Sequence, residues 1–185
     1  METVARKLPI GIQDFEDLRM NGNLYVDKTA YVYRLVTEGK PYFLSRPRRF
    51  GKILFISTLK AYFLGKKELF ENLAIAELEK EWIAYPVIYI DFNRGDCSDL
   101  PALKIVLNAT FDSYERQWGI TPKYDDVPVR FASLIEAVSE KTGQKVVVLV
   151  DEYDKALTLH RRRSSFGKSR SRTQHQSKRH YPMVG

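Results

Sequence analysis

The sequence has little of what several classes of functional site require. Its single cysteine, Cys97, excludes a disulfide within the chain and a cysteine metal cluster. The three histidines, His160, His175 and His180, all lie near the C-terminus, which disfavours a histidine-based site elsewhere. The longest apolar run, 146–150, is far shorter than the roughly 18–20 residues of a membrane-spanning helix, and the N-terminus has no apolar signal segment. We therefore expect a cytoplasmic protein without a membrane partner.

Acidic residues are absent from the last 25 residues, 161–185, which contain eight Lys and Arg. Removing these eight from the 30 basic residues of the chain leaves 22 against 23 acidic ones in residues 1–160. The formal charge of +7 therefore belongs to this segment and not to the body of the protein. Aliphatic residues nearly vanish there, so we expect a domain over 1–157 and a basic, disordered tail over 158–185.

The rest of the chain alternates between helical and extended patterns. Apolar residues recur at helical spacing in 30–38, 53–63, 103–118 and 128–142, and a more highly charged stretch over 67–82 is also expected to be helical. Thr29 is the expected N-cap of the first of these helices. Glycines follow several of these segments, as they do at helix ends; they are Gly39, Gly65, Gly119 and Gly143.

Three short apolar runs are expected to be buried strands: 42–44, 87–91 and 146–150. Continuous apolar strands separated by amphipathic helices favour a parallel sheet covered on both faces. The predicted fold class is therefore α/β, of the three-layer α/β/α P-loop NTPase type, with a partial parallel sheet of about three strands that is incomplete at the C-terminus. We expect the missing strands to leave an exposed sheet edge and marginal stability.

A loop that ends in Gly-Lys connects the first predicted strand to the next helix. This arrangement is typical of phosphate binding, because backbone N–H groups and the helix dipole at a helix N-terminus favour an anion. A lysine at the end of the loop adds a positive charge for the β- and γ-phosphates. The spacing of the P-loop pattern is matched imperfectly, since Arg46 stands at the first glycine position and Ile53 at the final Ser/Thr position. A solvated basic turn is the alternative. The candidate nucleotide-binding residues are Arg46, Pro47, Arg48, Arg49, Phe50, Gly51 and Lys52.

Two acidic residues, Asp151 and Glu152, follow the last apolar strand. A carboxylate at the carboxyl end of a buried strand can hold Mg²⁺ directly or through water, and a neighbouring glutamate can act as a general base toward water. The alternative is that the polar end of a buried strand simply meets solvent. The chain order, with the phosphate loop before the acidic strand, favours the functional interpretation.

Taken together, three segments resemble the bacterial AAA-ATPase-like family, whose members are predicted ATPases that often carry a nuclease-like domain of the restriction-endonuclease type. The segments are Tyr25–Thr29, Tyr42–Lys52 and Val150–Lys155, and the resemblance covers about residues 7–157. The string Arg-Pro-Arg-Arg-Phe-Gly-Lys is its most specific part. The resemblance implies ATP and Mg²⁺ as cofactors, with Asp151 as the metal ligand and Glu152 as the catalytic base in the Walker B motif. The motif Asp27-Lys28-Thr29 also matches, and we expect it at most to fix the N-terminal helix against the phosphate loop.

The chain departs from the family pattern at two places. Ile53 replaces the Ser or Thr whose hydroxyl would bind Mg²⁺. Ser57 lies one turn later, about 6 Å along the helix axis, and would reach the metal only through a water. The second departure is that the family pattern gives way to the basic tail just after the acidic strand, which suggests a truncated or frameshifted gene.

Three hypotheses for the function follow. The first is an ATP-binding domain with impaired hydrolysis, and the second is a non-catalytic remnant or interaction protein without useful nucleotide binding. The third is sequence-independent nucleic-acid binding through the basic tail. No nuclease activity is expected, because the nuclease-like domain is absent from this sequence.

Overall fold

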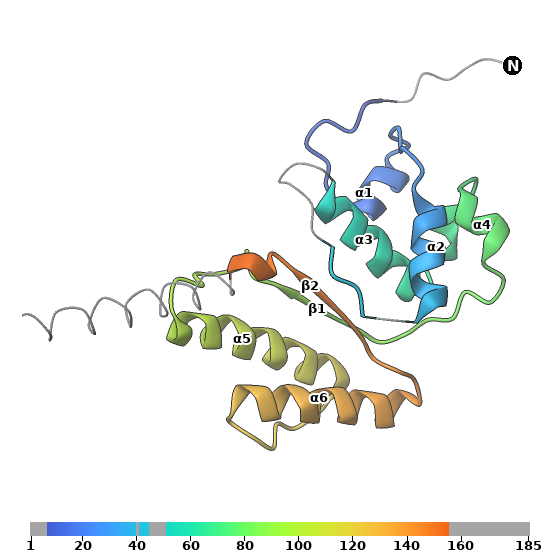
Figure 1. Cartoon of the computed structure of the whole chain (residues 1–185). Helices are drawn as coiled ribbons and strands as arrows, with labels where there is room; N and C mark the ends of the chain where they lie inside the picture. Colours follow the sequence, from blue (N-terminus) through green and yellow to red (C-terminus); the bar gives the residue numbers. More distant parts are fainter. Residues whose placement is uncertain (1–6, 40, 45–50, 156–185) are drawn as a thin grey trace, which may run out of the picture.

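The computed structural model describes residues 7–39, 41–44 and 51–155. Figure 1 shows helices on both sides of a small sheet. In chain order, the elements are α1 (Phe15–Met20), α2 (Thr29–Glu38), α3 (Lys52–Phe63), the 3-10 helix η1 (Lys67–Phe70), α4 (Ala74–Leu78), β1 (Val87–Asp91), α5 (Leu100–Trp118), α6 (Val127–Thr142) and β2 (Val147–Asp151). The fold is therefore mixed α/β, as the sequence predicts. The predicted tail over 158–185 lies outside the described residues.

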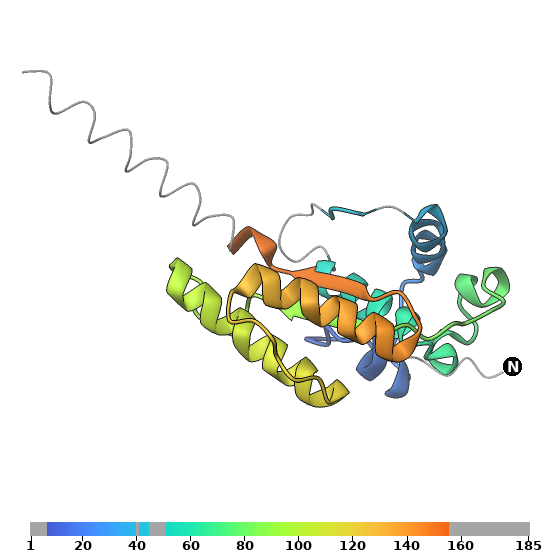
Figure 2. The same ribbon diagram turned by 90° about the horizontal axis from the view of Figure 1, so that it is seen from below.

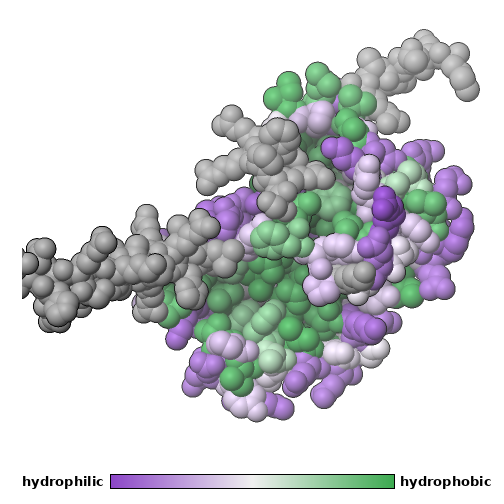
Figure 3. All heavy atoms as spheres, viewed as in Figure 1, coloured by the Kyte–Doolittle hydropathy of each residue, from purple (hydrophilic) through white to green (hydrophobic). Residues whose placement is uncertain are grey.

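The sheet consists of two parallel strands in the part of the chain that the structure describes, and not of about three. The register pairs Val87 with Val147 and continues to Asp91 opposite Asp151. The prediction of a strand over 42–44 is wrong, because this segment forms no ladder with β2. A groove of about 560 Å³, lined by residues 42–44 on one side and 148–150 on the other, separates the two segments. Apolar side chains gather over this part of the molecule in Figure 3.

Two predictions about helix boundaries also need correction. The expected helix over 67–82 is broken into η1 and α4, because Asn72 between them has a φ of 59° and cannot continue a helix. The expected N-cap, Thr29, is instead the first residue of α2, and Lys28 precedes it. The other helices agree closely with the sequence pattern. Gly39, Gly119 and Gly143 end α2, α5 and α6 in the left-handed conformation that glycine adopts without strain.

The buried side chains form two clusters with the sheet between them. One cluster joins α1, α2, α3, η1 and α4 around Phe15, Val32 and Phe70. The other packs α5 and α6 against β1 around Ile88, Phe111 and Leu134. Figure 1 shows α5 and α6 beneath the sheet, and Figure 2, which is seen from below, shows the two helices side by side. Helix α3 contacts both strands from the opposite side, so it connects the two clusters.

A buried ionic network holds α6 against α5. The Arg130 guanidinium donates to both carboxylate oxygens of Glu115, and also to Asp112 and to the Asn108 side-chain oxygen. The Arg130 and Glu115 side chains are only 11% and 5% exposed. Each charge is therefore compensated where water cannot solvate it.

The motif Asp27-Lys28-Thr29 fixes α2 to α4. The expected contact with the phosphate loop stays a prediction, because residues 46–50 of that loop lie outside the described residues. The Asp27 carboxylate accepts hydrogen bonds from the Thr29 backbone and hydroxyl and, at 2.7 Å, from the Ala74 N–H. The Thr29 hydroxyl oxygen accepts from the Ile75 N–H at 3.1 Å. Because a helix leaves its first N–H groups without partners in its own backbone, these two side chains cap α4 from a distant part of the chain.

Replacing Arg130 with methionine is expected to lower the free energy of unfolding by about 3–5 kcal/mol, because Glu115 would remain buried without a counter-charge. The measurement is urea denaturation followed by circular dichroism. Arg116→Met, on the exposed face of α5, is the matched control. The double variant Arg130→Met/Glu115→Leu should recover most of the loss. A loss below about 1 kcal/mol in Arg130→Met, as for an exposed ion pair, would show that the network does not stabilise the fold.

Replacing Asp27 with alanine is expected to destabilise the chain at neutral pH by about 1 kcal/mol through loss of the cap. Burial alone would raise the pKa of Asp27, but the hydrogen bonds from Ala74 and Thr29 outweigh it and hold the pKa below its ordinary value of 3.8. The stabilisation is therefore present above pH 3.8 and is lost as the pH falls through the lower pKa of the folded state. Urea denaturation of both proteins at a series of pH values tests this, with the exposed Asp125→Ala as control. If the difference in the free energy of unfolding between Asp27→Ala and the natural chain stays the same in acid, the stabilisation does not come from the ionised Asp27 carboxylate.

Candidate functional site

Helix α3 begins directly after Gly51, at the Gly-Lys pair of the predicted phosphate loop. Gly51 precedes the helix with a φ of 69°, and its carbonyl accepts the hydrogen bond from the Phe55 N–H. A Cβ at Gly51 would meet no atom within 4 Å, so the glycine is required by the left-handed backbone and not by a close neighbour. Lys52 is the first residue of the helix. Arg46, Pro47, Arg48, Arg49 and Phe50, the other predicted residues of the loop, lie outside the described residues.

The acidic residues lie where β2 ends. Asp151 is the last residue of the strand and is 2% exposed. Glu152 follows with a φ of 52°, a left-handed conformation that is strained for a residue with a Cβ. Strained backbone of this kind often accompanies functional sites. The parallel register also brings Asp91 to the same edge of the sheet, opposite Asp151.

The structure brings Lys52 together with both acidic residues, although they are far apart in the sequence. The Lys52 Nζ lies 3.2 Å from a Glu152 oxygen and 3.8 Å from Asp151 Oδ1. Burial alone would lower the pKa of Lys52, but Glu152 and Asp151 outweigh it and raise the pKa above its ordinary value of 10.5. The lysine is therefore a cation in this site at neutral pH, and its charge is balanced by carboxylates.

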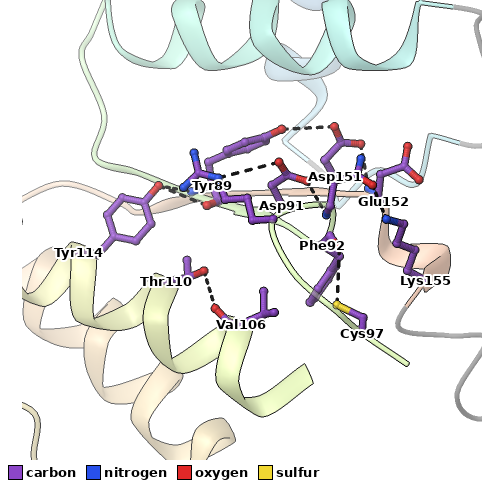
Figure 4. Close-up of polar contacts among 12 residues, drawn as sticks. Tyr89, Asp91, Phe92, Cys97, Val106, Thr110, Tyr114, Asp151, Glu152 and Lys155 are labelled. Atoms are coloured by element: carbon purple, nitrogen blue, oxygen red, sulfur yellow. Dashed lines mark hydrogen bonds and ion pairs between the residues drawn. The ribbon is translucent and has the colours of Figure 1, made fainter. Parts of the chain in front are cut away.

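The Asp151 carboxylate is held by further donors, which Figure 4 shows. Its Oδ1 accepts from the Glu152 N–H at 2.8 Å, and its Oδ2 accepts from the Tyr89 hydroxyl at 3.3 Å. Burial and the nearby charges of Asp151 and Asp91 raise the pKa of Tyr89, so its hydroxyl remains a donor at neutral pH. Sequence reasoning missed Tyr89. No local signal marks it, because its contact with Asp151 depends on the pairing of β1 with β2.

The backbone of β1 is also held from the side of α5. The Tyr114 hydroxyl accepts from the Tyr89 N–H at 2.7 Å and faces the Tyr89 carbonyl at 3.4 Å. Beyond the strand ends, the Lys155 ammonium donates to the Asn93 side chain, and the Asn93 N–H donates to Asp91 at 2.8 Å. These contacts fix the loop after β1 against the turn after β2, so the edge that carries the acidic residues is supported on both strands.

Ser57 does not lie ready to replace the missing hydroxyl at position 53. Its Oγ accepts from the Phe15 N–H at 2.9 Å and donates to the Leu54 carbonyl at 2.9 Å. The side chain therefore helps to hold α1 against α3, and Ile53 offers no oxygen atom.

In the described ranges no group of three or more acidic, histidine or cysteine side chains is arranged to hold a metal ion. The same ranges contain no helix that is long and apolar enough to span a membrane.

Comparison with known proteins adds a family match. Residues 9–184 match the model of the family AAA-ATPase_like, described as predicted AAA-ATPase. The match therefore runs through the boundary that the sequence analysis places after residue 157, and that boundary stays a prediction. The chain is 40% identical over 153 residues to an uncharacterized protein in the vnfD 5' region of Azotobacter chroococcum mcd 1. The similarity spans 82% of this chain but only 30% of that relative. No solved structure matches the chain.

Tyr89→Phe is expected to lower the free energy of unfolding by about 1 kcal/mol, because the buried Asp151 carboxylate would lose a donor that no water can readily replace. Urea denaturation measures the change. Tyr124→Phe, at a residue that is 49% exposed, is the matched control. Equal stability of Tyr89→Phe and Tyr124→Phe would mean that the hydroxyl contributes nothing to holding Asp151.

Proposed function

Because this chain belongs to the AAA-ATPase-like family, we propose that it binds ATP at the N-terminus of α3 and that its capacity to hydrolyse ATP is impaired. One observation carries the proposal: Lys52 at the start of α3 lies within 3.8 Å of Asp151 and Glu152 at the end of β2. One edge of the sheet thus carries a lysine that can bind phosphate and two carboxylates. Carboxylates of this kind are used to hold a metal ion and to activate water.

The phosphates of ATP would be bound by the N–H groups at the start of α3 and by the Lys52 ammonium. Without a ligand, that ammonium is paired with Glu152 and Asp151. Binding therefore requires Lys52 to exchange carboxylate oxygens for phosphate oxygens, which is favourable at a helix N-terminus because the dipole attracts the anion. Arg46, Arg48 and Arg49, which lie outside the described residues, are proposed to complete the loop around the phosphates.

Asp151 and Glu152 fit a magnesium ion that is held largely by the nucleotide. Mg²⁺ in such sites keeps several waters and takes one or two carboxylates together with phosphate oxygens, so a full cage of protein ligands is not required. When bound, the ion would neutralise charge that develops on the phosphates. Asp151, fixed by Tyr89 and by the Glu152 N–H, is the residue proposed to hold it. Glu152, released from Lys52, is proposed to accept a proton from water.

Ile53 is the reason to propose impaired hydrolysis. It is half-buried in the first turn of α3, next to Lys52, and its side chain has no donor or acceptor. The hydroxyl that family members use for Mg²⁺ is therefore missing, and Ser57 is bonded to Phe15 and Leu54 instead. Binding by backbone N–H groups and Lys52 does not need that hydroxyl, so ATP binding is proposed to survive the loss of metal-assisted hydrolysis.

A non-catalytic protein without useful nucleotide binding is the second candidate. Two observations favour it. The outer edge of β2 faces an open groove and has no partner strand among the described residues, and Lys52 at the proposed phosphate site is paired with the protein's own carboxylates. Nucleic-acid binding by the basic tail concerns residues outside the described part and stays a prediction. The Azotobacter relative is much longer than the matched region, so no activity of its remaining length is proposed for this chain.

The test compares Ile53→Thr with Ile53→Val, since threonine and valine have the same shape and differ by a hydroxyl in place of a methyl. ATP binding by calorimetry, with and without Mg²⁺, should be weak and metal-independent in the natural chain and in Ile53→Val. In Ile53→Thr it should become Mg²⁺-dependent and tighter by about tenfold, and phosphate release should rise.

Lys52→Ala is the control for the phosphate site, and binding should be lost in that variant. Circular dichroism establishes that each variant is folded. Absence of ATP binding to folded natural chain and to folded Ile53→Thr would overturn the proposal in favour of the non-catalytic candidate.

A further inference from the structure

A second pocket lies directly beside the start of α3. It has a volume of about 260 Å³ and is lined by residues from the N-terminal segment, from the stretch before α2 and from the first turn of α3. Figure 1 shows the N-terminal segment next to the beginning of α3. We call it the N-terminal pocket. The residues that line it are Leu8, Pro9, Leu18, Leu24, Tyr25, Val26, Lys28, Gly51, Leu54 and Phe55.

The pocket shares Gly51 with the proposed phosphate site. Gly51 immediately precedes Lys52, and Leu54 and Phe55 belong to the same turn of α3. A ligand whose phosphates lie at the helix N-terminus would therefore have its other end within reach of this pocket. The three segments that form the pocket are held together, because the Leu24 N–H donates to the Lys7 carbonyl at 2.8 Å and the Phe15 N–H donates to Ser57.

Most of the lining is apolar, and part of it is exposed to solvent. Leu8, Leu24 and Val26 are 67%, 42% and 71% exposed. A flat, largely apolar ring placed against them would remove this surface from water, which favours binding. Ligand sites are commonly of this kind, with an apolar lining and a few polar groups that fix the orientation.

Lys28, which has a positively charged side chain, is among the residues that line this pocket. Of the three residues in its motif, Asp27 and Thr29 are both bonded to the N-terminus of α4. Among the residues that the structure describes, the Lys28 ammonium has no hydrogen-bond or ion-pair partner. It lines a pocket that also includes Gly51, so it is placed to contact an anionic group between the apolar part of the pocket and the start of α3.

We propose that the N-terminal pocket binds the nucleoside end of the nucleotide, with a purine base against Leu24, Val26 and Leu54 and with the Lys28 ammonium at the α-phosphate. The inference rests on the proposed function, since it takes the β- and γ-phosphates to lie at Lys52. It assigns to Lys28 a ligand contact, whereas its two neighbours in the motif have a structural role. It also predicts that the chain distinguishes ATP from a bare polyphosphate.

The experiment uses two partial ligands on the full chain. Inorganic tripolyphosphate probes the start of α3 alone, and AMP probes the N-terminal pocket with one phosphate. Val26→Trp should fill the pocket without disturbing the core, because Val26 is 71% exposed. It should weaken ATP binding by about tenfold and abolish the transfer of saturation from protein to AMP in ligand-observed NMR, while tripolyphosphate binding stays unchanged. Val129→Trp, at a residue of α6 that is 45% exposed, is the matched control.

Lys28→Gln should weaken ATP and AMP binding and leave tripolyphosphate binding unchanged, and the exposed Lys104→Gln on α5 should change none of them. The outcomes separate the two proposals. In one outcome, tripolyphosphate binds and needs Lys52, but ATP binds no more tightly than tripolyphosphate and Val26→Trp does not weaken ATP binding. The pocket assignment is then wrong, and the phosphate site stands. If AMP and ATP respond to Val26→Trp while tripolyphosphate does not bind, the pocket stands and the phosphate site is wrong. Loss of AMP binding in Val129→Trp as well would overturn the assignment.

Discussion

Helix α3 lies between the helical cluster and the two-stranded sheet, and the arrangement of the remaining elements depends on its packing there. On one side it contributes Phe55 and Ala61 to the cluster around Phe15 and Phe70. On the other side it contacts both strands. At its N-terminus, Lys52 is paired with the two carboxylates that follow the last apolar residues of β2. The packing of α3 against the sheet is therefore also what brings the residues of the candidate site together.

The charges at this contact have two roles. In the free chain, Glu152 and Asp151 compensate a lysine that is only 18% exposed, and this compensation stabilises the junction between α3 and the sheet. A triphosphate would take over the same compensation, leaving the carboxylates available for a metal ion and water. The left-handed backbone of Glu152 fits this view, since strained conformations persist where the surrounding structure enforces them. The site is thus held together by its own residues in the free chain, and under the proposed function an anionic ligand would replace these contacts.

Neighbouring residues of the sequence motifs have different surroundings in the folded chain. In Asp27-Lys28-Thr29, the carboxylate and hydroxyl cap α4, and the lysine lines a pocket beside Gly51. At the end of β2, Asp151 points to Tyr89 and Lys52. The Tyr153 ring instead packs against Phe43 in a tilted arrangement, with a centroid distance of 4.4 Å. The sequence identified each motif but not the task of each residue, because adjacent side chains point in different directions and their partners come from distant segments.

Local physical chemistry determined much of this protein directly from its sequence. Apolar periodicity located α5 and α6, and a β-branched apolar run located β1 over the residues observed. The Gly-Lys pair followed by apolar residues at helical spacing placed Gly51 and Lys52 at a helix start, although the strand expected before this loop is not formed. Tertiary structure decided four other features. These are the division of 67–82 into two short helices, the groove where a third strand is expected, the hydrogen bond from Tyr89 to Asp151 and the buried Arg130 network. The physical reason is that helix and strand propensity act over a few neighbouring residues. Strand register, the pairing of buried charges and the capping of one segment by another depend instead on which distant surfaces can be packed together without leaving polar groups unsatisfied.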